Sequence, residues 1–144
     1  MNKTVETVLD FDQTCSVEDR FAIRRFIENF SELLSRANKP ELNSVFSDGV
    51  TILGISEFPL QKTQAIELFY KKFFGRKNNY FVLPKLKLTF HQYLFHLNGS
   101  YEEFEQGILS GSGTIEIALM KNEETFQIAK MVFYPRMLKQ ESYD

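Results

Sequence analysis

The hydrophobic period of this chain changes once, and that change limits its possible folds more than any other feature. Up to about residue 75, apolar residues recur at steps of three and four, as they do along one face of a helix. From Lys85 onward they alternate with polar residues, as they do in a strand with one buried face. Helices grouped first and strands grouped last predict an α+β fold, with the helices on one face of a curved sheet.

Three helices are expected in the first half of the chain. The first begins at Ser16, whose hydroxyl can cap it, and its apolar stripe consists of Ile23, Phe26, Ile27, Phe30, Leu33, Leu34 and Ala37. Pro40 cannot continue this helix, but it suits the first turn of a second, short helix. A third helix runs from about Thr63 to Gly75, and its apolar face consists of Ile66, Phe69, Tyr70 and Phe73.

The strands are expected as one early strand followed by an antiparallel meander of four. After a turn at residues 47–49, residues 50–55 form a buried strand and residues 58–60 a short edge strand. The meander begins at Lys85, and its later strands are expected at residues 101–109, 114–120 and 126–134. The turns between them are expected at residues 98–99 (Asn-Gly), 110–113 and 122–124. The predicted sheet is therefore mainly antiparallel.

Length and composition exclude several classes of protein. The 144 residues predict one domain at residues 16–135, with a polar lead-in at residues 1–15 and a tail at residues 136–144. A net charge of −2 gives no general attraction to nucleic acid or anionic lipid. The single Cys15 excludes an internal disulfide and a Cys-rich zinc site. Because residues 1–15 contain no apolar signal region and no stretch is long enough to span a membrane, we expect a cytoplasmic protein without a metal or cofactor.

Three segments, together with the first helix and the closing hairpins, carry a resemblance to a known superfamily. They are residues 36–42 (RANKPEL), 45–50 (VFSDGV) and 64–69 (QAIELF). Over residues 16–135 the chain resembles the nuclear transport factor 2-like superfamily, which has a cystatin-like cone fold and includes ketosteroid isomerases and SnoaL-like polyketide cyclases. The resemblance implies a strongly bent sheet around the helices, an apolar pocket between them, and a homodimer formed through the outer sheet face.

The resemblance does not carry the isomerase chemistry across. The positions that match the tyrosine donor, the general-base aspartate and the protonated carboxylic acid of ketosteroid isomerases are Phe30, Gly54 and Ile115. None of these side chains can donate or take a proton. A SnoaL-like enzyme would instead need an aspartate or histidine that faces the pocket.

Four residues are candidates for such an acid or base: His91, Tyr93, Tyr101 and Glu103. We place His91 and His96 on one strand, five residues apart and therefore on opposite faces, so that they cannot form a two-histidine metal site. Glu103 and Glu105 share a strand face with Tyr101, and such a pair can share a proton, hold a cation, or lie on a solvated face. The basic segment at residues 71–77 suits the C-terminal end of a helix and does not by itself indicate nucleic-acid binding.

Three functions follow from these observations. The first is binding of a small apolar or amphipathic molecule in an aromatic pocket, and the residues expected to line it are Phe26, Phe30, Phe46, Phe69 and Phe73. The second is a SnoaL-like isomerase, cyclase or hydrolase that uses the four candidate acid and base residues. The third is a structural or protein-interaction domain whose core is filled. The space left between the helices and the sheet discriminates the third from the other two.

Overall fold

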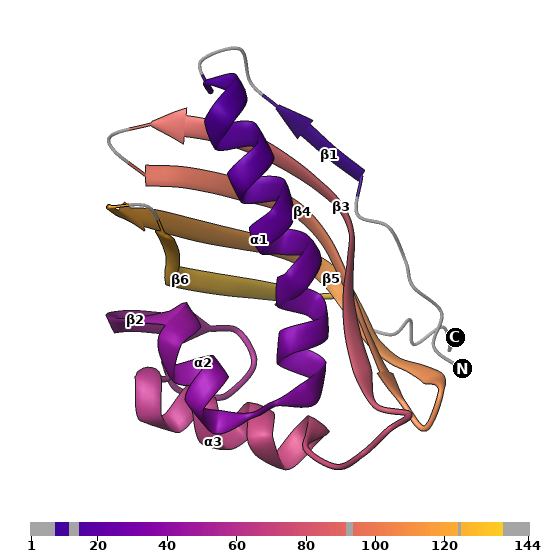
Figure 1. Ribbon diagram of the computed structural model, residues 1–144. Coiled ribbons are helices and arrows are strands. Elements are labelled where there is room, and N and C mark those ends of the chain that lie inside the picture. Colours follow the sequence, from indigo (N-terminus) through magenta and orange to yellow (C-terminus); the bar gives the residue numbers. More distant parts are fainter. Residues whose placement is uncertain (1–7, 12–14, 92–93, 124, 137–144) are drawn as a thin grey trace.

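The computed structural model describes residues 8–11, 15–91, 94–123 and 125–136, which form three helices and six strands (Figure 1). The helices are α1 (Val17–Arg36), α2 (Lys39–Val45) and α3 (Lys62–Phe73). The strands are β1 (Val8–Phe11), β2 (Phe46–Leu53), β3 (Tyr80–His91), β4 (Leu94–Glu105), β5 (Ile108–Asn122) and β6 (Thr125–Pro135).

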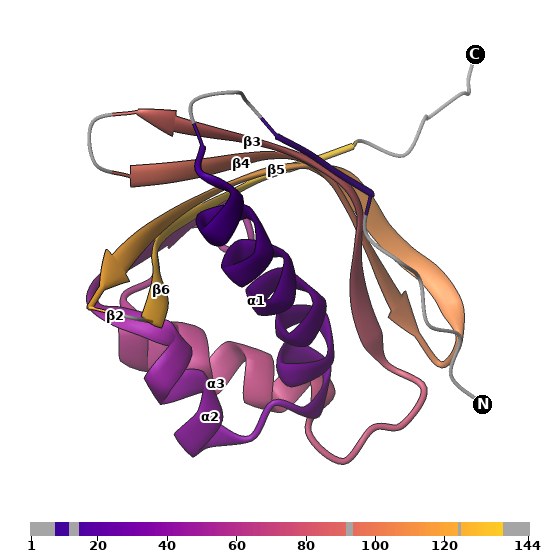
Figure 2. The ribbon, with the colours of Figure 1, turned by 45° about the horizontal axis from the view of Figure 1, so that its top comes forward.

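All six strands belong to one sheet in the order β1-β3-β4-β5-β6-β2. The four central strands are antiparallel, whereas the edge strand β1 is parallel to β3 and the edge strand β2 is parallel to β6. The sheet bends around the three helices, which all lie on its concave side (Figure 2). The predicted α+β cone, with helices on the concave face of a mainly antiparallel sheet, is therefore confirmed.

Helix α1 forms where its local signals predict it. The Ser16 hydroxyl accepts a hydrogen bond from the backbone N–H of Asp19 at 3.1 Å, which caps the first turn. One face of the helix is fully buried against the sheet and α3, and it consists of Ile23, Ile27, Phe30 and Leu34. The helix ends at Ala37, which has a left-handed backbone and donates its N–H to the Leu33 carbonyl.

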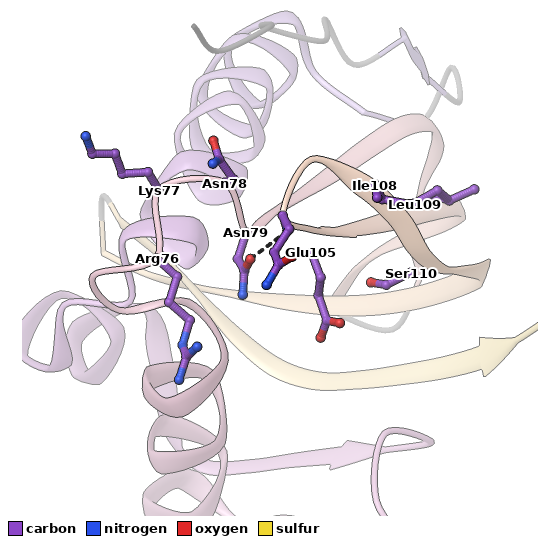
Figure 3. Close-up of a pocket in the computed structure, with 9 residues that line it drawn as sticks. Arg76, Lys77, Asn78, Asn79, Glu105, Ile108, Leu109 and Ser110 are labelled. Carbon is purple, nitrogen blue, oxygen red and sulfur yellow. Dashed lines mark hydrogen bonds between the residues drawn. The ribbon is translucent and has the colours of Figure 1, made fainter.

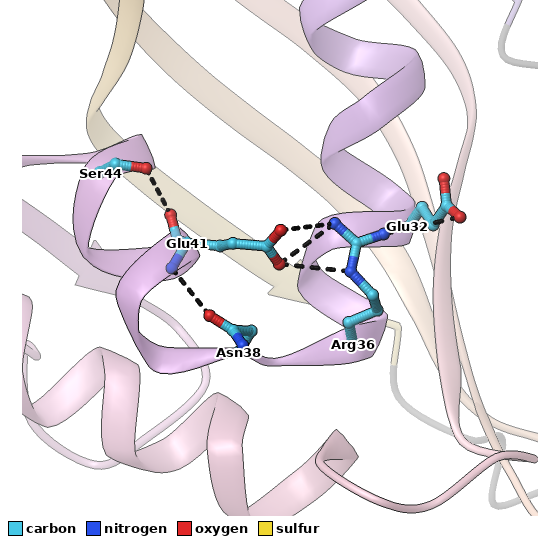
Figure 4. A network of polar contacts seen from close by, with 5 residues as sticks. All are labelled: Glu32, Arg36, Asn38, Glu41 and Ser44. Carbon is cyan, nitrogen blue, oxygen red and sulfur yellow. Dashed lines mark hydrogen bonds and ion pairs between the residues drawn. The ribbon is translucent and has the colours of Figure 1, made fainter.

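A polar network fixes the junction between α1 and α2 (Figure 4). The Arg36 guanidinium contacts both carboxylate oxygens of Glu41, at 3.0 and 3.1 Å, and lies 3.5 Å from the Glu32 carboxylate. The Asn38 side chain caps α2 by accepting from the Glu41 N–H at 3.1 Å, and the Ser44 hydroxyl donates to the Glu41 carbonyl at 2.8 Å. Because these groups are largely exposed, the network sets the direction of α2 more than it adds stability.

Strand β2 begins earlier than the sequence predicts. Residues 47–49 lie within β2, so the turn predicted there is wrong. The pairing of β2 with β6 shifts its register between Phe46 and Thr51, and this irregularity accommodates the turn-like residues inside a strand. The predicted edge strand at residues 58–60 contributes one bridge, in which Ile52 and Leu60 exchange two backbone hydrogen bonds of 2.9 Å.

The meander has the predicted number of strands, but two of its three turns lie elsewhere. Asn98 and Gly99 lie inside β4, opposite Lys87 and Leu86 of β3, because β3 ends at His91 and β4 begins at Leu94. A Cβ on Gly99 would lie 1.8 Å from the Lys85 carbonyl oxygen. This glycine therefore permits close contact between two strands where the sheet bends, instead of making a turn.

The turn between β4 and β5 is formed by Gln106 and Gly107, which both have positive φ angles, 55° and 78°. That geometry is the two-residue hairpin turn favoured by the twist of antiparallel strands. Residues 110–113, predicted as a turn, lie within β5. The last turn, between Asn122 at the end of β5 and Thr125 at the start of β6, is where the sequence predicts it.

The lead-in segment contains one element that the sequence analysis did not assign. Val8–Phe11 form β1, which pairs with residues 85–88 of β3. A strand of four residues at the edge of a sheet is too short to show a clear hydrophobic period. Among the described residues, no helix is both long and apolar enough to cross a membrane.

Candidate functional site

The five phenylalanines expected to line a pocket come together between the helices and the sheet. On α1, Phe26 and Phe30 are one turn apart, and their rings stack with centroids 6.2 Å apart. On the other side of the cone, Phe69 of α3 stacks on both Phe46 of β2, at 6.1 Å, and Phe73, at 6.4 Å. Phe26 is half-buried, whereas the other four side chains are at most 3% exposed. The prediction that these residues face the interior is correct.

Aromatic rings from the sheet occupy the space next to them. Phe126 of β6 contacts Phe26 edge-on at 6.3 Å and Phe95 of β4 at 5.6 Å. These separations lie within the range in which aromatic rings are in contact. Among the described residues no charged side chain is buried, and Ser47 is the only buried residue with a non-aromatic polar side chain. The interior is therefore packed with rings and holds almost no polar chemistry.

Two hollows that open at the surface lie beside α3. The larger, of about 600 Å³, lies between the turn that follows α3 and the β4–β5 hairpin, and it is lined by residues 76–79, 105, 106 and 108–110 (Figure 3). The smaller, of about 350 Å³, lies between Leu60 and the outer face of α3. None of the five phenylalanines lines either hollow.

Of the candidate acids and bases, His91 lies on the outer face of the sheet. His91 pairs with Leu94 of β4. The neighbouring pair, Phe90 and Phe95, lies on the concave side, where the two rings are in contact. His96 pairs with Thr89 and also lies on the outer face, so placing the two histidines on one strand and on opposite faces is wrong. The two histidines lie on different, antiparallel strands, because β3 ends at His91 and β4 begins at Leu94. Tyr93 lies outside the described residues.

No metal centre is formed by these or other side chains of the described segments. No group of three or more histidine, cysteine, aspartate or glutamate residues there lies close enough to hold an ion. Glu103 and Glu105, considered together as a cation site, have different surroundings: Glu103 is paired with Lys72, whereas Glu105 lines the larger hollow. Glu116 of β5 is exposed and accepts a hydrogen bond of 3.2 Å from the Tyr134 hydroxyl.

Tyr101 and Glu103 lie on the concave face of β4, at the end of the cone close to α3. Tyr101 is 5% exposed and packs between the rings of Phe81, at 5.9 Å, and Phe133, at 5.0 Å. Burial, and after it the charge of Glu103, raise the pKa of the Tyr101 phenol above its usual value, which keeps the phenol neutral well beyond neutral pH. The two residues thus supply a phenol donor and a carboxylate on one face of a strand.

The carboxylate of Glu103 is held by a lysine that the sequence analysis did not single out. Lys72 near the end of α3 places its Nζ 2.6 Å from Glu103 Oε2, and both side chains are partly buried. Such a pair fixes the orientation of the carboxylate, whose oxygens accept hydrogen bonds. Lys72 and Glu103 are 31 residues apart in the chain, so no local spacing could have revealed the contact.

The three positions that resemble the isomerase catalytic residues have structural roles. Phe30 and Ile115 are each 1% exposed and belong to the core. Gly54 follows β2 with a φ of +95°, and a Cβ at this position would lie 1.9 Å from the backbone oxygen of Phe133. Gly54 is therefore required by the contact between this segment and β6, and an aspartate would not fit there.

Hydrogen bonds hold the walls of the larger hollow together. The Asn79 side chain donates to the Lys72 carbonyl and accepts from the Gln106 N–H, both at 2.9 Å. The N–H of Gly107 donates to the Asn78 carbonyl, also at 2.9 Å. The turn after α3 is thus tied to the tip of the β4–β5 hairpin, and Figure 3 shows Asn79 between Arg76 and Glu105 in that view. The Gln-Gly pair at the hairpin tip is a turn signal that could have located this corner.

Searches with protein-family models and against curated proteins find no match to this chain. Solved structures, by contrast, match most of its length. A protein of unknown function with a cystatin-like fold from Nostoc punctiforme has a TM-score of 0.70 at 9% identity, covering 87% of this chain and 96% of its own. An NTF-2-like protein of unknown function from Silicibacter pomeroyi has a TM-score of 0.64 at 12% identity, covering 85% of this chain and 100% of its own.

A third match is described as a putative scytalone dehydratase from Novosphingobium aromaticivorans. It has a TM-score of 0.66 at 12% identity, and the alignment covers 84% of this chain and 86% of the other. At these identities the likeness establishes the fold alone. The chain therefore has the fold of the nuclear transport factor 2-like superfamily, as its sequence predicts, and that fold is compatible with ligand binding and with enzymes.

Proposed function

We propose that this chain is a structural or protein-interaction domain with a filled interior, and that it acts through its surface. One observation carries the proposal: the residues expected to line a pocket contact one another instead. Phe69 stacks on both Phe46 and Phe73, while both hollows open at the surface. A ligand pocket needs space and a few polar groups that point into it. Neither of the two hollows lies among the phenylalanines, which supports a filled interior.

Binding of a small apolar or amphipathic molecule is the second candidate, with Phe26, Phe30, Phe46, Phe69 and Phe73 as its contacts. Two observations favour it. One is the buried phenol of Tyr101 beside the Lys72–Glu103 pair, which resembles the polar end of an apolar site. The other is that a putative dehydratase shares the fold. In this alternative, which includes a SnoaL-like isomerase, cyclase or hydrolase, Tyr101 and Glu103 would contact the substrate.

Benzene binding discriminates between the two functions. We expect benzene and a metabolite library to leave the unfolding temperature of the native protein unchanged, because no interior space is open to them. Phe69→Ala removes a ring that is 3% exposed and should destabilise the protein by about 3–5 kcal/mol. Because apolar cavities of about 150 Å³ in protein cores bind benzene, benzene should raise the unfolding temperature of this variant.

If Phe69→Ala does not fold, the smaller substitution Phe69→Leu can replace it in the benzene experiment. Phe69→Leu leaves a smaller space, so benzene should stabilise it less than it stabilises Phe69→Ala. Stabilisation of the native protein by benzene, or by any library compound that competes with benzene, would show open space among the rings. That result would reject the filled interior and support the small-molecule function.

Assembly and compartment complete the proposal. We propose a homodimer through the outer face of the sheet, where Val132 is half-buried and Tyr134 is 49% exposed. A surface of this mixed character suits a contact between copies better than a fully charged one. Sedimentation equilibrium tests this part, and a monomer at all concentrations would reject it.

We also propose that the protein is cytoplasmic, where the buried thiol of Cys15 would stay reduced.

A further inference from the structure

We infer that the larger hollow, between the turn after α3 and the β4–β5 hairpin, docks an acidic segment of a partner protein that also carries apolar side chains. The inference rests on the proposed function, because it names the surface and the kind of partner through which such a domain would act. It is supported by three features of this corner, namely its charge, its exposed apolar side chains and its rigidity.

The charge of the corner is positive although the protein as a whole is acidic. Lys71, Arg76 and Lys77 are exposed, and none of them takes part in an ion pair within the described residues. The dipole of α3 accounts for cations in its last turn, where Lys71 lies. Arg76 lines the hollow and its Nε donates a hydrogen bond of 3.2 Å to the Lys71 carbonyl, so the helix end accounts for part of its position. The helix end does not account for Lys77, which lies further along the chain and also lines the hollow. These two cations suit carboxylates on a partner.

The apolar part of the corner lies at the start of β5. Ile108 is 71% exposed and Leu109 is 51% exposed, and both line the hollow together with the two cations. Later in the same strand, Ile115, Ile117 and Leu119 are all at most 1% exposed. Exposure of two large aliphatic side chains to water at a hairpin tip is unfavourable, and a partner that covers them would gain the free energy of burying their apolar surface. The combination of apolar and basic groups fits a segment that is both acidic and apolar.

The corner is also preformed, because the bonds of Asn78 and Asn79 tie the turn to the hairpin. Binding there would lose little conformational entropy. Its shape favours a peptide over a lipid surface, since the hollow is concave and Glu105 lies in its wall. A flat anionic bilayer would meet that carboxylate, whereas a peptide can direct its acids toward Arg76 and Lys77 and a donor toward Glu105.

Selection from a library of random dodecapeptides displayed on phage tests the inference. We expect the selected peptides to be enriched in aspartate or glutamate together with leucine, isoleucine or phenylalanine, and their affinity to fall as salt is raised. The Arg76→Glu/Lys77→Glu variant should bind a labelled selected peptide about tenfold more weakly or worse. The Ile108→Ser/Leu109→Ser variant removes the apolar contacts and should also weaken binding. Arg25→Glu reverses an exposed charge on α1, away from the hollow and from the outer sheet face, and should leave the affinity unchanged.

Three results would overturn the inference. The first is selection without enrichment of acidic residues over the starting library. The second is binding that both corner variants retain. The third is binding to vesicles of phosphatidylcholine and phosphatidylglycerol that depends on Arg76 and Lys77 when no peptide binds, which would make a membrane the occupant. The benzene experiment measures the interior alone, so the filled core and the docking corner can fail independently.

Discussion

Replacement of Gly54 by alanine tests whether this position has a structural role that excludes a catalytic one. The position resembles that of an isomerase general base, but its backbone has a φ of +95° and an added Cβ would lie 1.9 Å from the Phe133 oxygen. The left-handed backbone alone costs a residue with a Cβ about 1–2 kcal/mol. The contact adds to this, because β6 is held by β5 on its other side and cannot move away without losing hydrogen bonds.

Together these costs should destabilise Gly54→Ala by about 3–4 kcal/mol, which corresponds to a fall of roughly 10 °C in the unfolding temperature of a domain of this size. Urea denaturation followed by circular dichroism measures the change. Two other glycines separate the two causes. Gly75 has a φ of +72° with nothing within 4 Å, so Gly75→Ala should cost only about 1 kcal/mol. Gly49 has neither constraint, and Gly49→Ala should stabilise the protein by about 0.4–1 kcal/mol.

The order of the three variants decides the outcome. If Gly54→Ala is no less stable than Gly75→Ala, the contact with Phe133 does not constrain the chain, and the exclusion of an acid at this position is wrong. Gly54→Asp extends the test to function. It should be at least as unstable as Gly54→Ala and should gain no ketosteroid isomerase activity, since the side chain has no room near the strand.

Two further predictions concern the Tyr101 corner. Burial and the Glu103 charge raise the pKa of Tyr101 in the folded state, so the folded protein holds this proton more tightly than the unfolded chain does. Stability is therefore lost as the pH rises from about 10 through the folded pKa. Urea denaturation between pH 8 and 11 should therefore show a shallower loss for Tyr101→Phe than for the native protein, and equal slopes would contradict the burial of this phenol. A double-mutant cycle of Lys72→Met and Glu103→Gln should give a coupling energy of about 1 kcal/mol, whereas the more exposed pair Lys39–Glu67 should show no resolvable coupling. Equal coupling in both pairs would mean that partial burial does not strengthen the first.

Much of the fold could be predicted because its signals are local. The Ser16 cap and the three- and four-residue spacing lie within α1 itself, and they place the helix almost to the residue. The alternation after Lys85 predicts strands for the same reason, since each strand turns one face to the core. Local signals therefore sufficed for the three helices, the four strands of the meander and the fold class, but not for β1.

The turns were harder to predict because glycine has two uses in a sheet. A Cβ on Gly99 or Gly113 would lie 1.8 or 2.2 Å from a backbone oxygen of the neighbouring strand, so both glycines permit close contact between strands. The sequence shows a glycine in the same way whether it turns the chain or lies against another strand. The errors at residues 98–99 and 110–113 have this common origin.

The candidate site could be predicted only in part. The inward direction of the phenylalanines follows from the helix period, whereas the space between them depends on how rings from distant strands fit together. Phe26 and Phe126 are in contact although they lie 100 positions apart in the chain. Likewise, the pairing of Lys72 with Glu103 depends on the curvature of the sheet. That the five phenylalanines bind a ligand stays a prediction.

The packed interior also limits how this chain could acquire a pocket. Loss of one buried ring costs about 3–5 kcal/mol, and the total stability of a domain is about 5–15 kcal/mol. One such loss is therefore tolerable, while two would leave little or no stability unless a ligand filled the space. A chain that is selected to bind in its interior would be expected to keep that space open and to place polar groups at its edge. Here neither hollow lies among the rings, whereas Arg76, Lys77, Ile108 and Leu109 line the hollow beside the β4–β5 hairpin. This distribution of side chains is what the proposed surface function requires.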